Sequence, residues 1–160
     1  MTPSSEDFNF IFGRWIGHND KMVDPFDPDC TKWVNFDATD EAAPILGGLG
    51  HIHRMYVPDM PGGDSFEGFT LRLYDPATSA WKIWSSSTRS PGVLETPLAG
   101  RFTNGHGVFE CDDILGGEPA KVRFEWFSDP VKPRWQQSFS WDAGATWRLN
   151  WTMVFERVSL

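Results

Sequence analysis

The stretch LAGRFTNGHGVFECDD, residues 98–113, decides the fold class of this chain. Two runs of alternating residues, 98–103 and 106–113, lie on either side of Asn104 and Gly105. Asn-Gly between two such runs is among the strongest hairpin signals, because both residues accept the positive φ that a tight turn between twisted strands requires. The stretch therefore predicts an antiparallel hairpin.

Most of the chain repeats this pattern of short extended runs and turns. Fifteen Gly and 12 Pro interrupt it, and a helical stripe is found only near the N-terminus. Because the runs follow one another without a crossover helix, we predict an all-β fold, an up-and-down antiparallel meander of about nine or ten strands closed into a barrel. The predicted strands are 14–23, 31–39, 44–57 (with a glycine bend), 66–75, 80–87, 98–103, 106–113, 120–128, 134–141 and 146–158.

Residues 4–12 predict a short N-terminal helix, with serines that can cap it and acidic residues in its first turn. The barrel is expected to occupy 14–158, and the whole chain, 1–160, is expected to form a single lipocalin-like domain around one hydrophobic core. Three apolar residues of the helix share a face that would pack onto the barrel: Phe8, Ile11 and Phe12.

Composition excludes several classes of partner. The formal net charge is −8, whereas nucleic acids and anionic membranes bind clustered Lys and Arg. The N-terminus lacks the features of a signal peptide and no apolar run is long enough to span a bilayer, so we expect a cytoplasmic protein. Cys30 and Cys111 are then expected to be free thiols, and neither is in a zinc-binding pattern.

Trp15 in FGRWIG (12–17) and Arg157 in FERV (155–158) resemble the signature pair of the calycin superfamily, the lipocalins and their relatives. In that superfamily a tryptophan of the first strand closes the barrel floor and a basic residue of the last strand packs across its indole. Blocks such as PILGGLGHIHR and TLRLYDPATSAWKIW look like a narrower family of uncharacterised bacterial lipocalin-like proteins, over about residues 8–157. The resemblance implies a barrel with a small-molecule cavity, and it implies no particular activity.

Tryptophan is abundant for a narrow barrel, since each buried indole N–H needs a partner. Nine Trp are present, and several are predicted to line a cavity for a flat aromatic or polyene-like ligand. Two strand arginines are predicted to contact the same ligand. The predicted ligand-binding residues are Trp15, Trp33, Trp84, Trp126, Trp135, Trp151, Arg101 and Arg123.

Arg72 allows two interpretations. Strict alternation places Leu71 and Leu73 on one face and Arg72 on the other, which favours a solvated arginine. The alternative is an inward arginine that holds a carboxylate or an enolate. The same alternatives apply to Arg123.

His51 and His53 are two residues apart on a predicted strand and so share a face. With Arg72 they are the candidate catalytic residues, serving as acid, base and anion holder. A metal or haem site at the two histidines is the alternative. It would need a third ligand, with His18 and His106 as the remaining histidines, and we predict neither a metal nor a cofactor.

SWDAGATW, residues 140–147, fits the Asp-box turn pattern. We interpret it as the tip of the last hairpin, with Asp142 accepting backbone N–H groups and Gly144 supplying a positive φ. The turn is expected to set a register in which Trp147, Leu149, Trp151, Met153, Phe155 and Arg157 all face the interior.

Three hypotheses for function follow. The first is a barrel that binds one small hydrophobic or aromatic molecule in a Trp-lined cavity. The second is a cofactor-free isomerase, cyclase or lyase that acts on such a molecule in the same cavity, where shape and desolvation supply much of the catalysis. The third is a homodimer whose exposed apolar strands serve only assembly.

Overall fold

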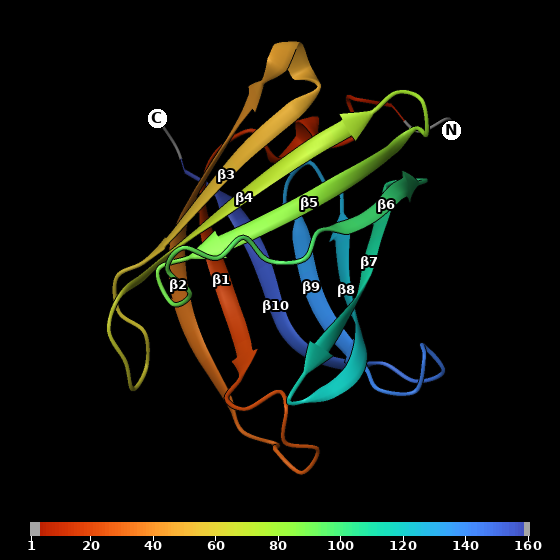
Figure 1. Ribbon diagram of the computed structural model, residues 1–160. Coiled ribbons are helices and arrows are strands. Elements are labelled where there is room, and N and C mark those ends of the chain that lie inside the picture. Colours follow the sequence, from red (N-terminus) through yellow and green to blue (C-terminus); the bar gives the residue numbers. More distant parts are fainter. Residues whose placement is uncertain (1–3, 159–160) are drawn as a thin grey trace.

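The computed structural model describes residues 4–158, which form a closed antiparallel barrel (Figure 1). Each strand pairs with the next along the chain, and the last pairs with the first. The predicted all-β meander is therefore confirmed, with ten strands. They are β1 (Gly13–Met22), β2 (Trp33–Ile45), β3 (Gly50–Val57), β4 (Phe66–Asp75), β5 (Ala80–Ser87), β6 (Leu98–Thr103), β7 (His106–Leu115), β8 (Glu118–Phe127), β9 (Arg134–Ser140) and β10 (Arg148–Arg157).

The β6–β7 hairpin forms as its sequence indicates. Asn104 has φ 51° and Gly105 has φ 79°, the two positive values that a tight turn between twisted strands requires. At the glycine bend after β2, the single 3₁₀ turn η2 (Leu46–Gly48) separates β2 from β3. The expected extended run 44–57 is thus a turn followed by a strand.

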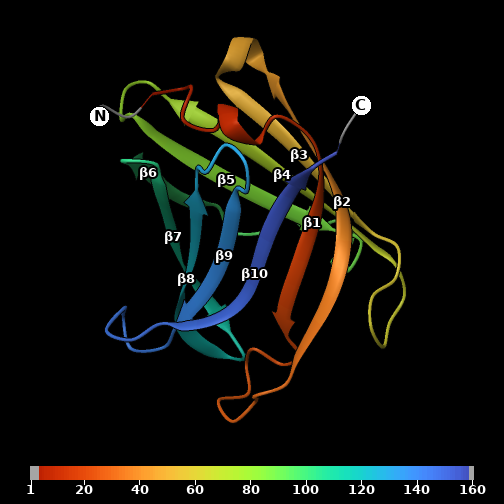
Figure 2. The same ribbon diagram turned by 180° about the vertical axis from the view of Figure 1, so that it is seen from behind.

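The prediction of an N-terminal helix over 4–12 is wrong. The segment contains one 3₁₀ turn, η1 (Asn9–Ile11), at the end of the barrel where the described chain begins and ends (Figure 2). So short a segment cannot repay the cost of helix nucleation, and its conformation follows the packing of Phe8 and Ile11. Both side chains are completely buried in the barrel core, as the sequence predicts.

The junction of β1 and β10 closes the barrel as the sequence resemblance implies. Trp15 pairs with Arg157 across the two strands, and the guanidinium carbon is 3.9 Å from the indole centroid. The same arginine donates a hydrogen bond to the carbonyl of Phe12 (3.0 Å), and the indole of Trp15 donates one to the carbonyl of Ile11 (2.8 Å). These contacts attach the N-terminal segment to the end of the barrel.

The last hairpin corrects one prediction. Its Asp-box turn forms, with Asp142 accepting hydrogen bonds from the backbone N–H (2.8 Å) and the hydroxyl (2.5 Å) of Thr146. However, the pairing of β9 with β10 shifts between Leu149 and Trp151. This bulge reverses the side-chain alternation, so Trp147 and Leu149 lie outside, contrary to the prediction. The guanidinium carbon of Arg123 is 3.8 Å from the indole centroid of Trp147.

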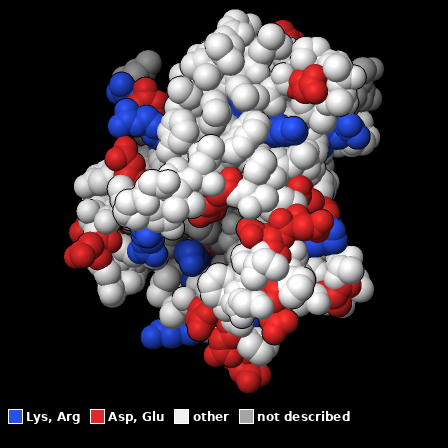
Figure 3. All heavy atoms as spheres, in the orientation of Figure 1, with Lys and Arg blue, Asp and Glu red and all other residues white. Residues whose placement is uncertain are grey.

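The outer surface carries acidic side chains with basic ones between them, as one face shows in Figure 3. Cys30 and Cys111 are both free thiols, as predicted, and both are half-buried. Within residues 4–158, no helix has the length and apolar character needed to cross a membrane.

Candidate functional site

The barrel has a solid aromatic floor at the end that carries η1. Phe8 enters from η1 and makes edge-on ring contacts with Trp81 (5.0 Å between centroids) and Phe102 (4.8 Å). Trp126 stacks on Phe155 at 5.6 Å. Phe8, Trp81, Phe102 and Phe155 are all at least 95 % buried, so aromatic side chains close this end of the interior.

Above the floor lies a cavity of about 600 Å³, a size typical of sites for one small molecule. Most of its wall is apolar, because alternate residues of nearly every strand point inward. The apolar and aromatic lining includes Met55, Phe66, Ile83, Leu98, Val122, Phe124, Trp126, Trp135, Phe139, Trp151 and Met153.

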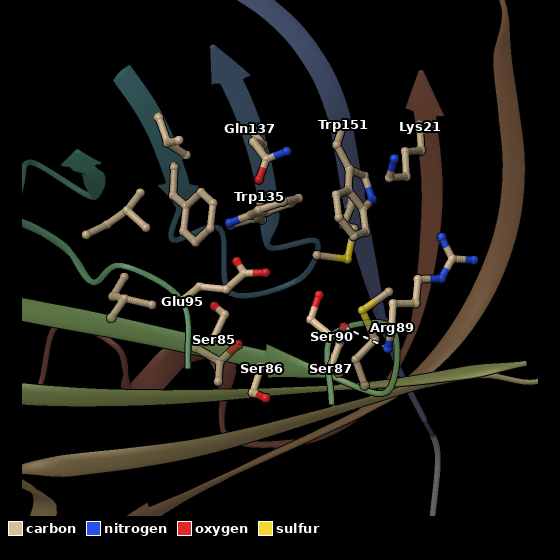
Figure 4. A pocket seen from close by; sticks show the side chains of 18 of the residues that line it. Lys21, Ser85, Ser86, Ser87, Arg89, Ser90, Glu95, Trp135, Gln137 and Trp151 are labelled. Atoms are coloured by element: carbon tan, nitrogen blue, oxygen red, sulfur yellow. Dashed lines mark hydrogen bonds between the residues drawn. The ribbon is translucent and has the colours of Figure 1, made fainter. Parts of the chain in front are cut away.

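The mouth of the cavity is polar and mixed in charge. In Figure 4, Trp135 and Trp151 form one wall, and Glu95 faces them together with Ser85 and Ser87 of β5. Lys21 lies beside Trp151, with its ammonium 5.3 Å from the indole centroid. Burial, and secondarily Arg89, lowers the pKa of Lys21, whereas burial and then Asp113 raise the pKa of Glu95.

At the inner end of the cavity, three polar side chains from adjacent strands form a chain of contacts. His53 Nε2 is 2.8 Å from Asp40 Oδ1, and Arg72 Nη2 is 3.4 Å from His53 Nδ1. An arginine can only donate, so Nδ1 accepts and Nε2–H donates to the carboxylate. Asp40, His53 and Arg72 are all at least 94 % buried, with exposed fractions of 3 %, 6 % and 1 %.

Desolvation determines the charge state of this chain. Burial lowers the pKa of His53, and this effect outweighs the hydrogen bond to Asp40, which raises it. Burial also lowers the pKa of Arg72 to about 9. At neutral pH the inner end therefore holds a neutral imidazole beside a cationic guanidinium.

No known protein family and no curated protein matches this chain. Its function must therefore be inferred from the cavity itself.

The structure places about half of the predicted site residues at the cavity. Trp126, Trp135 and Trp151 line it, as do His53 and Arg72. Two others are buried beneath it in the floor without lining it, namely Trp15 and His51.

Four predicted ligand-binding residues lie on the outer face, away from the cavity. Trp33 is 38 % exposed, and Trp84 alternates with the inward Ile83. Arg101 donates a hydrogen bond to the carbonyl of Thr78 (3.1 Å). Arg123 pairs with Glu110 (3.0 Å), which is the solvated arrangement that alternation favours.

Arg72 corrects the expectation drawn from alternation. It points inward, and Leu71 and Leu73 face outward, half-buried. The apolar residues of β4 mark the wrong face because the outer surface of this barrel is itself partly apolar. On the inner face of β4, Thr70 and Tyr74 lie two residues before and two residues after Arg72.

The three-histidine metal hypothesis has no third ligand. His18 lies outside between Asp37 (2.8 Å) and Glu156 (3.0 Å), and His106 pairs with Glu125 (2.8 Å). Across residues 4–158, no group of three or more His, Cys, Asp or Glu side chains could hold a metal ion.

Sequence reasoning missed Asp40, the carboxylate that orients His53. A signal was available, because Asp40 follows Phe36 and Ala38 at two-residue spacing, on the same face of one strand. An acid on a face that is otherwise buried indicates a paired polar group. Sequence reasoning also missed Lys21 and Glu95 at the mouth. Their positions depend on where β1 ends and on the path of the segment between β5 and β6.

Proposed function

We propose that this protein binds one small hydrophobic or aromatic molecule inside its barrel, in the manner of lipocalin-like binding proteins. The cavity of about 600 Å³, lined by Trp126, Trp135 and Trp151, is the observation that carries the proposal. A cavity of this size holds a single small molecule, and flat indole walls favour a flat apolar partner. The closing contact of Trp15 with Arg157 supports a calycin-type barrel.

N-phenyl-1-naphthylamine, a neutral dye that fluoresces in apolar surroundings, tests this proposal. We expect saturable binding of one dye per chain and energy transfer from tryptophan. Gly68→Phe should abolish binding by filling the cavity, since Gly68 lines it and a Cβ there would meet only the Met55 Cβ, at 3.9 Å. Ala99→Phe, at an exposed outward position of β6 that does not line the cavity, is the matched control.

Melting curves must first show that both variants are folded. Undiminished dye binding by folded Gly68→Phe would place the dye elsewhere and contradict the proposal. Absence of binding by the unaltered protein would also contradict it.

The contacts among Asp40, His53 and Arg72 favour a second candidate, a cofactor-free enzyme acting on a molecule in the same cavity. Asp40 holds Nε2–H of His53, so Nδ1 is the atom that would take a proton from the bound molecule, once the guanidinium of Arg72 turns from Nδ1 to the enolate oxygen that forms. The probe is 2-tetralone, a flat ketone whose α-hydrogens exchange with deuterium in D₂O. Faster exchange with the protein than with His53→Gln supports an enzyme, and equal rates contradict it.

A further inference from the structure

Arg72 is a buried cation that lacks an anionic partner of its own. Its guanidinium lies 4.6 Å from the centroid of Phe8 and 5.5 Å from that of Trp126. Its one polar contact among residues 4–158 is the 3.4 Å approach to His53, and its Nε has no hydrogen-bond partner within that range. Stacking on the rings offsets part of the free-energy cost of desolvating the cation. The guanidinium still has N–H groups without a hydrogen-bond acceptor among these residues.

Asp40 does not supply the missing anion. Its carboxylate accepts from His53 Nε2 at 2.8 Å, so the imidazole lies between the acid and the guanidinium. The other carboxylate oxygen, Oδ2, has no hydrogen-bond partner among residues 4–158, and no ion pair joins Asp40 to Arg72 within that range. Arg72 therefore keeps free donor capacity at the cavity wall. A buried cation with unused N–H groups at the inner end of a cavity is arranged to receive a ligand.

The geometry of the donor selects the ligand group. A guanidinium presents parallel N–H groups that match the two oxygens of a carboxylate. A single guanidinium carries one positive charge and suits a singly charged group better than a dianionic phosphate. The other cations of the cavity, Lys21 and Arg89, share its lining with the acids Asp24, Glu95 and Asp113. The charges at the mouth are therefore balanced, and selection of an anion falls to Arg72.

We infer that the ligand of this barrel is a small aromatic or apolar monocarboxylate, whose carboxylate pairs with Arg72 while its apolar body lies against Trp126, Trp135 and Trp151. This inference rests on the proposed function and adds the charge and the orientation of the ligand. The acid end enters first and the apolar end is left toward the mouth.

A matched pair of probes tests the inference by isothermal titration calorimetry: 2-naphthoate and 2-naphthamide, which share a shape and differ in charge. We expect the unaltered protein to bind 2-naphthoate at least about tenfold more tightly than the amide. In Arg72→Met the two affinities should become equal within about twofold. Arg123→Met removes an arginine from the outer face and should leave the tenfold preference unchanged.

Arg72→Lys provides a second variant if Arg72→Met fails to fold. It keeps the charge but loses the paired donors, so the preference for 2-naphthoate should fall. The unaltered protein alone already decides the question. The inference of a carboxylate ligand is contradicted if the two probes bind equally tightly. It is also contradicted if protein that binds N-phenyl-1-naphthylamine does not bind 2-naphthoate. In both cases the proposed function is unaffected. If the protein binds none of the three compounds, the proposed function itself is contradicted.

Discussion

At the scale of single residues, His51 is a buried histidine whose two ring nitrogens have no hydrogen-bond partner among residues 4–158. Aromatic side chains surround it, with centroid distances of 4.7 Å to Phe12 and 4.7 Å to Trp81. Burial, and then the charge of Arg72, lowers the pKa of His51 to about 3. At neutral pH the ring is therefore uncharged and packs among aromatic side chains.

This environment predicts an acid-dependent loss of stability. Between pH 6.5 and about 3 the unfolded chain binds a proton at His51 and the folded chain does not, so the free energy of unfolding falls as the pH falls. The slope is up to about 1.4 kcal/mol per pH unit for each such histidine. His51→Phe should flatten the slope and raise the stability at pH 5, as measured by urea unfolding at pH 5 and 7.

His18 is the control, because its pKa shift has the opposite sign. Hydrogen bonds that the imidazole donates to Glu156 and Asp37 raise the pKa of His18, so its contribution to stability is present below pH 6.5 and is lost as the pH rises through the folded pKa. His18→Gln should therefore steepen the acid loss. Equal slopes for His51→Phe and the unaltered protein would show that His51 is not the group responsible.

At the scale of secondary structure, the hairpins were predictable and the side-chain facing was only partly so. The bounds of β4, β5 and β6 match the sequence pattern because turn residues delimit them. Facing depends instead on what covers each side of a strand, which is why Arg72 points inward. A bulge such as the one between Leu149 and Trp151 leaves no signature in alternation.

The β6–β7 hairpin provides a test at this scale. A Cβ added at Gly100 would lie 1.8 Å from the carbonyl oxygen of Val108, a backbone atom of the paired strand. Gly100→Ala should therefore force the two strands apart and destabilise the barrel by about 3 kcal/mol. Chemical denaturation measures the loss.

Gly68→Ala is the matched control on β4, where the added Cβ would approach only Met55, at 3.9 Å. It should be neutral or raise the stability by about 0.5 kcal/mol, since alanine loses less backbone entropy than glycine. A similar stability for the two variants would mean that the β6–β7 pair is not as close as the structure has it.

At the scale of the whole molecule, the barrel depends on joining strands from opposite ends of the chain. Trp15 and Arg157 are neighbours across β1 and β10, and the sequence resemblance alone pointed to that contact. Asp40, His53 and Arg72 come together without that closure, since β2, β3 and β4 are consecutive strands that pair with one another. The polar chain is thus a product of local strand order, whereas the contact of Trp15 with Arg157 depends on closure.

Arg157→Ala tests the contribution of this junction. It removes the contact with the indole of Trp15 and the hydrogen bond to the carbonyl of Phe12. We expect a loss of about 1–2 kcal/mol in the free energy of unfolding, measured by urea denaturation. Arg14→Ala, which loses only an exposed 3.9 Å pairing with Glu41, should change stability by less than about 0.5 kcal/mol. Equal losses of stability in the two variants would show that Arg157 contributes no more than an exposed arginine.

The amino-acid sequence by itself determined the succession of strands and turns, because Gly, Pro and Asn-Gly act locally on the backbone. It also paired His51 with His53 on one face, through the two-residue period of a strand. Only the tertiary structure decided which face is inside, and therefore that Arg72 enters the barrel while Trp33, Trp84, Arg101 and Arg123 remain outside. Facing depends on how the curved sheet closes and on what packs against each side, and these contacts join residues that are far apart in the chain.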